Sequence, residues 1–407
     1  MPWKRPHATF AFRRHGFIAR PSPLLHRRPR DVAPGRGSAQ GFIAAKALWT
    51  DALPAALVPP VVFCGLLGAL WFYKCCMMIL FQNKIIYMPG VPLFARRERI
   101  VDYERQCRPI VWTEERIITD DGKQIALCVS RKETAGEVNA ENPKRARRVV
   151  IVYFQGNASS LPPRLPLLSA TLRSLGDLGK LTKNDGDRPV HYSVVAVSYR
   201  GYWTSEGSPS QKGIERDAGA ALRWVSLRYA EDDDDVKVVL WGQSVGAGIA
   251  TTAAVQSLRI RNRHGALTSG LGKGHDVPGI HGMILETPFT SLRDMLVAIY
   301  PQRWLPYRYL GSFLRNWWDS RAALRQLSHV AAEDGSRSPP PTILLLRAEQ
   351  DELVPHENAA ELKSVCEQLG FPVKLVTVRG ALHNDVMIRS QGRNAVTEFL
   401  SMIGQTQ

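Results

Sequence analysis

The stretch VKVVLWGQSVGAGIATTAAV, residues 236–255, decides the fold. It begins with an apolar run typical of a buried β-strand and ends with small residues typical of a closely packed helix. Between the two lies the turn Gly242-Gln243-Ser244-Val245-Gly246. A serine projected from such a tight strand-to-helix turn needs small neighbours, because the backbone there leaves no room for larger side chains. We therefore predict that Ser244 is a nucleophile.

A serine nucleophile also needs N–H donors for the negative charge that develops on the substrate oxygen. The N–H of Val245, at the start of the helix, is the first candidate donor. A second donor is expected in the loop after an earlier strand, and RRVVIVYF (147–154) leads directly into Gln155-Gly156-Asn157-Ala158. We predict that the N–H of Asn157 is this donor, with a shift by one residue or an ordinary glycine turn as alternatives.

Two further side chains complete the predicted chemistry. His383 is the only one of the ten histidines that follows the last predicted strand and precedes the final helix. Asp351 comes directly after the strand TILLLRA (342–348), where a carboxylate can orient an imidazole. We predict that His383 takes the proton of Ser244 and that Asp351 holds the required tautomer. Glu286 is the alternative acid, and a surface histidine is the alternative interpretation of His383.

Strand and helix patterns alternate along the rest of the chain. A hairpin at 111–129 with an Asp121-Gly122 turn comes first. Strands separated by helical stretches favour an α/β fold whose twisted, mainly parallel sheet has helices on both faces. Polar or Gly/Pro-rich interruptions at 133–147, 178–190, 263–280 and 331–341 are expected to be surface insertions. The predicted strands are 147–154, 192–199, 236–241, 282–286, 342–348 and 373–378, and the predicted helices are 210–230, 245–262, 356–369 and 391–403.

An uncharged stretch near the N-terminus is long enough to cross a membrane. Ala52 to Tyr73 contains 22 residues without a charge, and a bilayer core needs about 20 apolar residues in a helix. Proline residues near its start can delay the helix. We predict a transmembrane anchor at 52–82, with a buried or interfacial helix as the alternative.

Positive charge is concentrated before this stretch. The net charge is +16, and residues 1–50 hold ten Lys or Arg residues against one acid, Asp31. The other basic residues are scattered, so nucleic-acid binding is not expected. We predict a basic, disordered segment at 1–50. It fits the positive-inside rule and also resembles a mitochondrial presequence, so we expect a single-pass protein of the endoplasmic reticulum or another endomembrane, with a mitochondrial membrane as the alternative.

The six cysteines show no CxxC spacing, and no metal or organic cofactor is expected. The adjacent Cys75 and Cys76 can carry palmitoyl groups or be plain thiols at the membrane flank. The acidic run at 231–235 is expected to be a solvated turn rather than a metal site. No cysteine pattern or acidic cluster therefore competes with the serine chemistry predicted above.

These segments together resemble the Bem46-like branch of the α/β-hydrolases, membrane-anchored serine hydrolases related to the ABHD lipases and depalmitoylases. The resemblance covers about residues 75–400 and implies an α/β-hydrolase domain at 100–404. Gln155 stands where the family usually has His before Gly-Asn. Arg200 is expected to pair with Glu206 and hold the turn. The matching segments are FQNKIIYMP (81–89), GNA (156–158), YRGY (199–202) with SEG (205–207), GQSVG (242–246), Asp351 with Val354-Pro355, and His383-Asn384-Asp385.

An aromatic-rich segment is expected to form a small cap over the serine, at about 290–328. Its aromatic residues can line an acyl channel, contact a lipid interface or pack inside the cap. With the anchor, this favours cleavage of lipid esters or acyl thioesters through an acyl-serine intermediate. The alternatives are a protein-depalmitoylating thioesterase, an esterase or peptidase for soluble substrates, and a catalytically silent scaffold. The aromatic residues are Trp304, Tyr307, Tyr309, Phe313, Trp317 and Trp318.

Overall fold

The computed structural model describes residues 54–132, 147–181, 189–229, 236–267, 279–333 and 339–406. It contains two units, residues 1–67 and residues 68–407. The predicted basic segment at 1–50 and the acidic run at 231–235 lie outside the described residues. The four predicted insertions lie mostly in the other undescribed segments, but helices extend into three of them, as far as Leu181, Leu267 and Glu333.

One long apolar helix begins in the first unit. The short η1 (Ala55–Leu57) continues into α2 (Val58–Leu80), and together they form a 26-residue stretch that is long and apolar enough to cross a membrane. The predicted anchor at 52–82 thus contains a candidate membrane span. At Phe81 the helix is interrupted, and α3 (Gln82–Tyr87) follows in the second unit.

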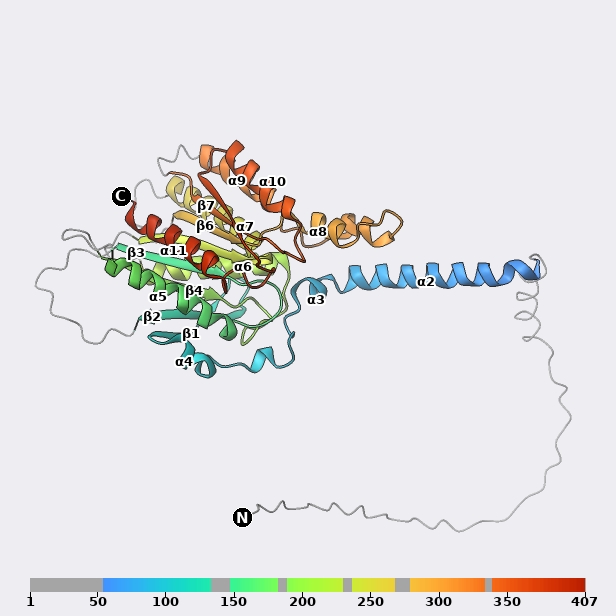
Figure 1. Ribbon diagram of the computed structural model, residues 1–407, viewed down its shortest axis with the longest axis horizontal. Helices are drawn as coiled ribbons and strands as arrows, with labels where there is room; N and C mark the ends of the chain where they lie inside the picture. Colours follow the sequence, from blue (N-terminus) through green and yellow to red (C-terminus); the bar gives the residue numbers. More distant parts are fainter. Residues whose placement is uncertain are drawn as a thin grey trace, which may run out of the picture. The chain divides into compact units, whose positions relative to one another are not determined.

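An eight-stranded sheet lies at the centre of the second unit (Figure 1), with the order β1-β2-β4-β3-β5-β6-β7-β8. The hairpin of β1 and β2 is antiparallel, and β2 pairs antiparallel with β4, whereas all other pairs are parallel. The mainly parallel sheet and the hairpin are as predicted. The strands are β1 (Ile110–Ile118), β2 (Gln124–Lys132), β3 (Arg147–Phe154), β4 (Val190–Val197), β5 (Val236–Gln243), β6 (Ile280–Glu286), β7 (Thr342–Ala348) and β8 (Val373–Val378).

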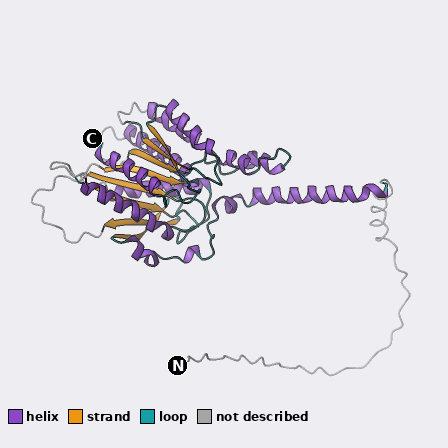
Figure 2. Ribbon diagram, in the orientation of Figure 1, coloured by secondary structure: helices purple, strands orange, loops and turns teal. Residues whose placement is uncertain are grey.

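Helices cover both faces of the sheet (Figure 2) and enclose two apolar cores. Helices α6, α7, α9 and α10 contribute to one core, and α5 and α11 contribute to the other. The short elements η2 (Ala95–Arg97), η3 (Ile100–Tyr103), α4 (Glu104–Cys107) and η4 (Pro162–Arg164) lie outside these layers of long helices. The long helices are α5 (Leu165–Leu181), α6 (Gln211–Tyr229), α7 (Val245–Leu267), α9 (Ser320–Glu333), α10 (His356–Gln368) and α11 (Ser390–Gln405).

Alternate residues of each central strand supply the two cores. Val150 and Val152 of β3 face the α6 and α7 side, whereas Ile151 and Tyr153 face the α5 and α11 side. A strand buried on both faces is apolar at nearly every position, which explains the continuous runs in the sequence. Helices α5 and α9 are not among the predicted helices. Both contribute leucines to these cores.

The predicted cap is only partly separate from the sheet layers. Between β6 and α9 the chain forms α8 (Leu292–Ile299) and η5 (Pro306–Phe313). From Ser320 onward it forms α9, which packs against α7 and α10 and belongs to the helix layer. Residues 292–318 therefore form the cap, a shorter stretch than the predicted 290–328.

The cap aromatics divide into two groups. Trp318 and Tyr307 are buried, so packing in the core is their role in the structure. Trp304, Tyr309, Phe313 and Trp317 are exposed. The exposed group is concentrated in and beside η5.

Candidate active site

Ser244 lies in a strained turn between β5 and α7. Its φ angle is 53°, which is rare for a residue other than glycine. A Cβ added at Gly242 would lie 2.1 Å from the carbonyl oxygen of Gly246, and one added at Gly246 would lie 2.1 Å from that of Phe154. The N–H of Ser244 donates to the carbonyl oxygen of Glu286 at 2.8 Å. Any larger residue at Gly242 or Gly246 would therefore collide with backbone atoms, as the sequence pattern indicated.

The three side chains predicted to carry the chemistry lie together. The Oγ atom of Ser244 is 3.0 Å from Nε2 of His383, and Nδ1 of His383 is 3.0 Å from both carboxylate oxygens of Asp351. Asp351 follows β7, and His383 lies between β8 and α11. The carboxyl ends of neighbouring parallel strands meet at one edge of a sheet, so residues distant in sequence converge there.

Backbone groups help to keep Asp351 ionised. The N–H groups of Leu353 and Val354 donate to its Oδ1 atom at 3.0 and 2.8 Å. Burial alone raises the pKa of the Asp351 carboxyl, but the hydrogen bonds from His383 and Val354 outweigh burial and hold that pKa below its ordinary value. The backbone N–H of His383 donates to Glu352 at 3.0 Å. The carboxylate of Asp351 is therefore ionised at neutral pH and can accept a hydrogen bond from Nδ1–H of His383.

The loop after β3 passes beside the serine. A Cβ added at Gly156 would lie 3.6 Å from the Cβ of Ser244. Within the described residues, the N–H groups of Asn157 and Val245 donate to no protein acceptor, whereas the N–H of Ala158 donates to the carbonyl oxygen of Tyr87. The N–H groups of Asn157 and Val245 are thus available to a substrate oxygen.

Tyr87 joins the segment after the candidate membrane helix to this site. It is fully buried, and its carbonyl oxygen also accepts a hydrogen bond from the hydroxyl of Tyr202. Its own hydroxyl donates to Oδ1 of Asn316 at 2.9 Å and accepts from Nε1 of Trp318 at 2.8 Å. In the sequence, FQNKIIYMP (81–89) stood only as one of the segments that resemble the family. The buried network was missed, because the partners of Tyr87 are far away along the chain.

Glu286, the alternative acid, lies beneath the turn rather than beside the imidazole. Its carboxylate accepts from Nε1 of Trp241 at 3.1 Å and from Nε2 of Gln243 at 3.3 Å. Burial raises the pKa of Glu286 to about 7. Among the described contacts no hydrogen bond joins it to His383, so the geometry favours Asp351 as the partner of that histidine.

Gln155, which departs from the usual family pattern, is only 1 % exposed. Its carbonyl oxygen accepts from the hydroxyl of Tyr199 at 2.7 Å. Neither polar atom of its side chain has a hydrogen-bond partner in the described part of the chain. Buried amides are almost always paired, so this side chain is an energetic cost close to the site.

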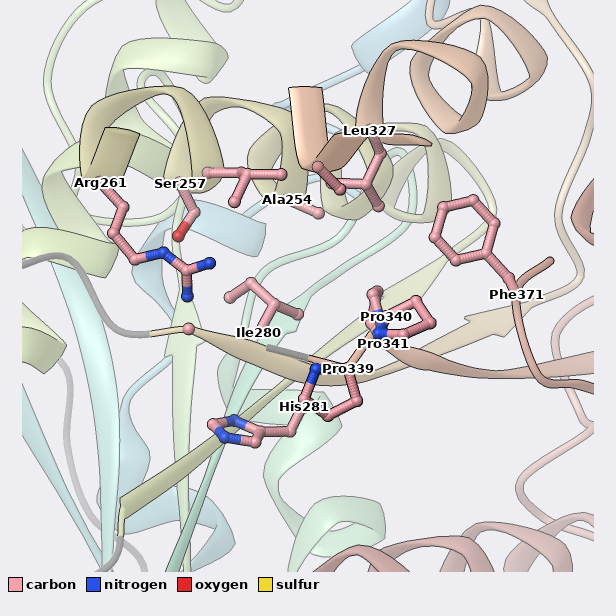
Figure 3. A pocket seen from close by; sticks show the side chains of 13 residues that line it. Ala254, Ser257, Arg261, Ile280, His281, Leu327, Pro339, Pro340, Pro341 and Phe371 are labelled. Carbon is pink, nitrogen blue, oxygen red and sulfur yellow. The ribbon is translucent and has the colours of Figure 1, made fainter. Parts of the chain in front are cut away.

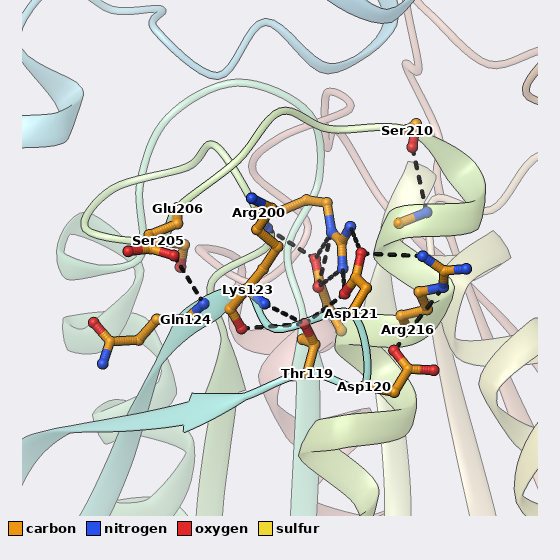
Figure 4. A network of polar contacts seen from close by, with 12 residues as sticks. Thr119, Asp120, Asp121, Lys123, Gln124, Arg200, Ser205, Glu206, Ser210 and Arg216 are labelled. Atoms are coloured by element: carbon orange, nitrogen blue, oxygen red, sulfur yellow. Dashed lines mark hydrogen bonds and ion pairs between the residues drawn. The ribbon is translucent and has the colours of Figure 1, made fainter.

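Arg200 holds the neighbouring turn, but through other partners than predicted (Figure 4). Its guanidinium pairs with Asp217 and Asp121, each at 2.8 Å, whereas Glu206 accepts from the backbone N–H of Gln124 at 3.1 Å. The expected pair of Arg200 with Glu206 is therefore wrong. A buried guanidinium is stabilised by an anionic partner that is buried with it, and Asp217 is fully buried, whereas Glu206 and the second partner, Asp121, are exposed. The role of this network is structural.

A cavity of about 310 Å³ lies away from the serine (Figure 3). It is lined by Ile280 and His281 at the start of β6, by Pro341 before β7, and by side chains of α7 and α9. It therefore lies at the amino ends of these strands, whereas Ser244 lies at the carboxyl end of β5. Within the described ranges, no group of three or more His, Cys, Asp or Glu side chains is placed to hold a metal ion.

The fold and the site define a hydrolase. The sequence model of the alpha/beta hydrolase family matches residues 169–391, and the chain belongs to this family. A crystal structure of an alpha-beta hydrolase from Vibrio vulnificus has the same fold, with a TM-score of 0.50 at 16% identity, over 79% of this chain and 90% of that chain. The predicted fold class is thus confirmed.

Within the family, the chain is a Bem46-like member of the ABHD group. Protein bem46 of Schizosaccharomyces pombe is 26% identical over 65% of this chain and 70% of that protein. The lysophosphatidylserine lipase ABHD12 of Danio rerio is 28% identical over 62% of this chain and 58% of that protein. The predicted resemblance is confirmed, and the chain is a hydrolase of the esterase and lipase type.

Proposed function

We propose that this protein is a membrane-anchored serine hydrolase that cleaves carboxylic esters or thioesters of acyl chains through an acyl-serine intermediate. The observation that carries the proposal is the hydrogen-bonded chain from Ser244 through His383 to Asp351. A serine joined in this way to an imidazole and a carboxylate has the geometry of an activated nucleophile.

In the first half of the proposed reaction, Nε2 of His383 takes the proton of Ser244 as Oγ attacks the substrate carbonyl carbon. Asp351 stabilises the imidazolium that forms. The N–H groups of Asn157 and Val245 donate to the oxyanion of the tetrahedral intermediate. Collapse of this intermediate breaks the ester bond, and His383 protonates the departing alcohol or thiol.

In the second half, water attacks the acyl-serine carbonyl carbon. His383 takes a proton from this water, and the same N–H groups again stabilise the oxyanion. Collapse then breaks the bond to Oγ, which regains its proton from His383. The carboxylic acid leaves, and the side chains return to their starting state.

Three observations support a lipid or acyl substrate. The chain contains a candidate membrane span at Ala55–Leu80. The cap between β6 and α9 exposes several aromatic side chains. ABHD12 of Danio rerio, a relative, is a lysophosphatidylserine lipase. We propose a single-pass membrane protein of the endoplasmic reticulum or another endomembrane, which acts on esters that reside in that membrane.

Labelling with a fluorophosphonate probe tests the activated serine. The full-length protein in membranes is compared with Ser244→Ala and His383→Ala, and with Ser208→Ala as a matched control at an exposed serine. We expect wild type and the control to be labelled and both site variants to lose labelling. Undiminished labelling of Ser244→Ala, or no labelling of folded wild type, would overturn the proposal.

A further inference from the structure

The cap and the segment after α2 expose an unusual number of large apolar side chains. Trp304 is 67% exposed and Leu93 is 83% exposed. Contiguous exposed apolar surface on a soluble domain usually marks an interaction site. We call this set the apolar rim. It consists of Ile299, Trp304, Tyr309, Phe313 and Trp317 of the cap, and of Leu80, Phe81, Ile85, Leu93 and Phe94.

The cap contacts the end of the candidate membrane helix through Trp304 of the rim and through two other cap residues, Tyr307 and Arg315. The ring of Trp304 lies 5.8 Å from that of Trp71, measured between centroids. Lys74 Nζ lies 4.4 Å from the ring centre of Tyr307. The guanidinium of Arg315 donates to the carbonyl oxygen of Ile79 at 2.9 Å. The cap is therefore held against residues 71–79, and whatever surrounds that stretch of helix also meets the cap.

The chemistry of these contacts matches a bilayer interface. Tryptophan and tyrosine favour the headgroup level, because their rings are apolar and their tips are polar. A lysine near a helix end keeps its charge at that level while its stem lies in apolar surroundings. The uncharged stretch of the sequence ends at Tyr73, so Trp71, Lys74 and the contacting Trp304 fall where the hydrocarbon core gives way to headgroups.

We propose that the apolar rim is a docking surface for the phospholipid bilayer, into which the cap inserts beside α2. The proposal rests on the membrane anchorage and the hydrolase activity proposed above, and it deepens them by stating how substrate arrives. An acyl lipid passes from the bilayer along the cap to the serine without crossing water. The substrate class is then membrane-resident lipid esters, and soluble short-chain esters bypass this route.

The rim is linked to the candidate active site through two buried residues, Trp318 and Tyr87. Phe313 and Gln82 are joined by a hydrogen bond of 3.1 Å, so η5 of the cap contacts α3. The cap ends at Trp318, which packs against Gly248 in the first turn of α7, just after the serine. A Cβ added at Gly248 would lie 3.0 Å from the Cβ of Trp318. On the other side, α3 leads to Tyr87, which binds the loop of Asn157 through its neighbour Ala158. Both parts of the rim are thus connected by contacts to the segments that flank Ser244.

The test separates lipid delivery from chemistry. Trp304→Ser with Phe313→Ser is compared with Leu227→Ser with Met402→Ser, a control pair of exposed apolar residues on α6 and α11. Each full-length protein is reconstituted into phosphatidylcholine vesicles. The substrates are a monoacyl phospholipid within the vesicles and a water-soluble butyrate ester.

We expect the rim variant to lose about tenfold or more in kcat/KM on the vesicle lipid, because apolar side chains supply interfacial insertion. Its rate on butyrate should stay within about twofold of wild type, and the control pair should match wild type on both substrates. An unchanged vesicle rate in the rim variant would overturn the proposal. An equal loss on both substrates would also overturn it, since the two residues would then support the site itself.

A second measurement is independent of catalysis. In the Ser244→Ala background, tryptophan fluorescence is quenched with phospholipids brominated along the acyl chain, with and without Trp304→Phe. We expect removal of Trp304 to lower the quenched fraction of the emission. An unchanged fraction would place Trp304 outside the bilayer and overturn the docking surface. A lowered fraction, together with no hydrolase activity of the wild-type protein on either substrate, would keep the docking surface and reject the proposed function.

Discussion

The carbonyl oxygen of Tyr87 accepts a hydrogen bond from the N–H of Ala158 at 2.9 Å, which joins the segment after the candidate membrane helix to the loop beside Ser244. Ala158 has a φ angle of 57°, and a residue other than glycine keeps such a conformation only where its surroundings hold it. The segment after α2 is therefore part of the candidate active site as well as a connection to the candidate membrane helix.

The hydroxyl of Tyr87 tests this structural role. In Tyr87→Phe, Asn316 and Trp318 lose their shared buried partner, so we expect the free energy of unfolding to fall by about 1–3 kcal/mol. Tyr309→Phe is the control, because its hydroxyl bonds at the surface, and its effect should stay below about 0.5 kcal/mol. Denaturant unfolding in detergent measures both variants. Equal stability of Tyr87→Phe and wild type would contradict the buried network.

The turn at Ser244 leaves no space for a side chain at Gly246. In Gly246→Ala the new Cβ would lie 2.1 Å from the carbonyl oxygen of Phe154, so we expect a loss of about 3 kcal/mol or more, or failure to fold. Gly176→Ala is the matched control in α5, where nothing lies within 4 Å of the added Cβ. That change should stabilise the helix by about 0.5–1 kcal/mol. Thermal unfolding and yield of folded protein distinguish the two, and a well-folded Gly246→Ala protein would argue against this turn geometry.

Glu286 gives the protein a pH-dependent stability. Burial raises the pKa of its carboxyl from 4.5 to about 7, so its contribution to stability is complete below pH 4.5 and is lost as the pH rises to about 7. The loss is on the order of 3 kcal/mol, at about 1.4 kcal/mol for each pH unit. Asp351, whose pKa is lowered, changes stability only in more acidic solution.

In Glu286→Gln this ionisation is absent. We therefore expect wild type to lose stability relative to Glu286→Gln between pH 5 and pH 8. Unfolding of both proteins at several pH values measures the difference. Parallel stability curves across this range would show that Glu286 does not titrate there.

The unpaired amide of Gln155 predicts a stabilising substitution. Gln155→Leu removes two buried polar atoms that lack partners, so we expect the free energy of unfolding to rise by about 1 kcal/mol. Gln243→Leu is the control, because its side chain bonds to Glu286 and to Tyr153. This change should destabilise the protein. A lower melting temperature for Gln155→Leu would mean that the amide of Gln155 has a partner after all.

Local sequence patterns predicted much of the fold. The runs at 147–154 and 236–241 are apolar at nearly every position, because β3 and β5 are buried on both faces, and this signal needs no knowledge of their partners. The glycines around Ser244 likewise reflect contacts made within a few residues. The order of Ser244, Asp351 and His383 along the strands predicted that they meet, and their geometry agrees with that expectation.

Contacts between distant residues escaped prediction. Arg200 pairs with Asp121 and Asp217 rather than with the nearby Glu206, because tertiary packing, which sequence spacing does not reveal, places those two carboxylates beside the guanidinium. The sequence also gave no sign that Trp318 is buried while Trp317 beside it is exposed.

The sequence by itself determined the strand-turn-helix at Ser244, the α/β alternation and the apolar stretch near the N-terminus, since each depends on neighbours in the chain. Only the tertiary structure decided that Tyr87 belongs to the site and that the cap lies against residues 71–79. The partners in these contacts lie far apart along the chain. Tyr87 is 229 residues from Asn316 and 231 residues from Trp318. Packing of whole elements brings such residues together, and no local pattern records it.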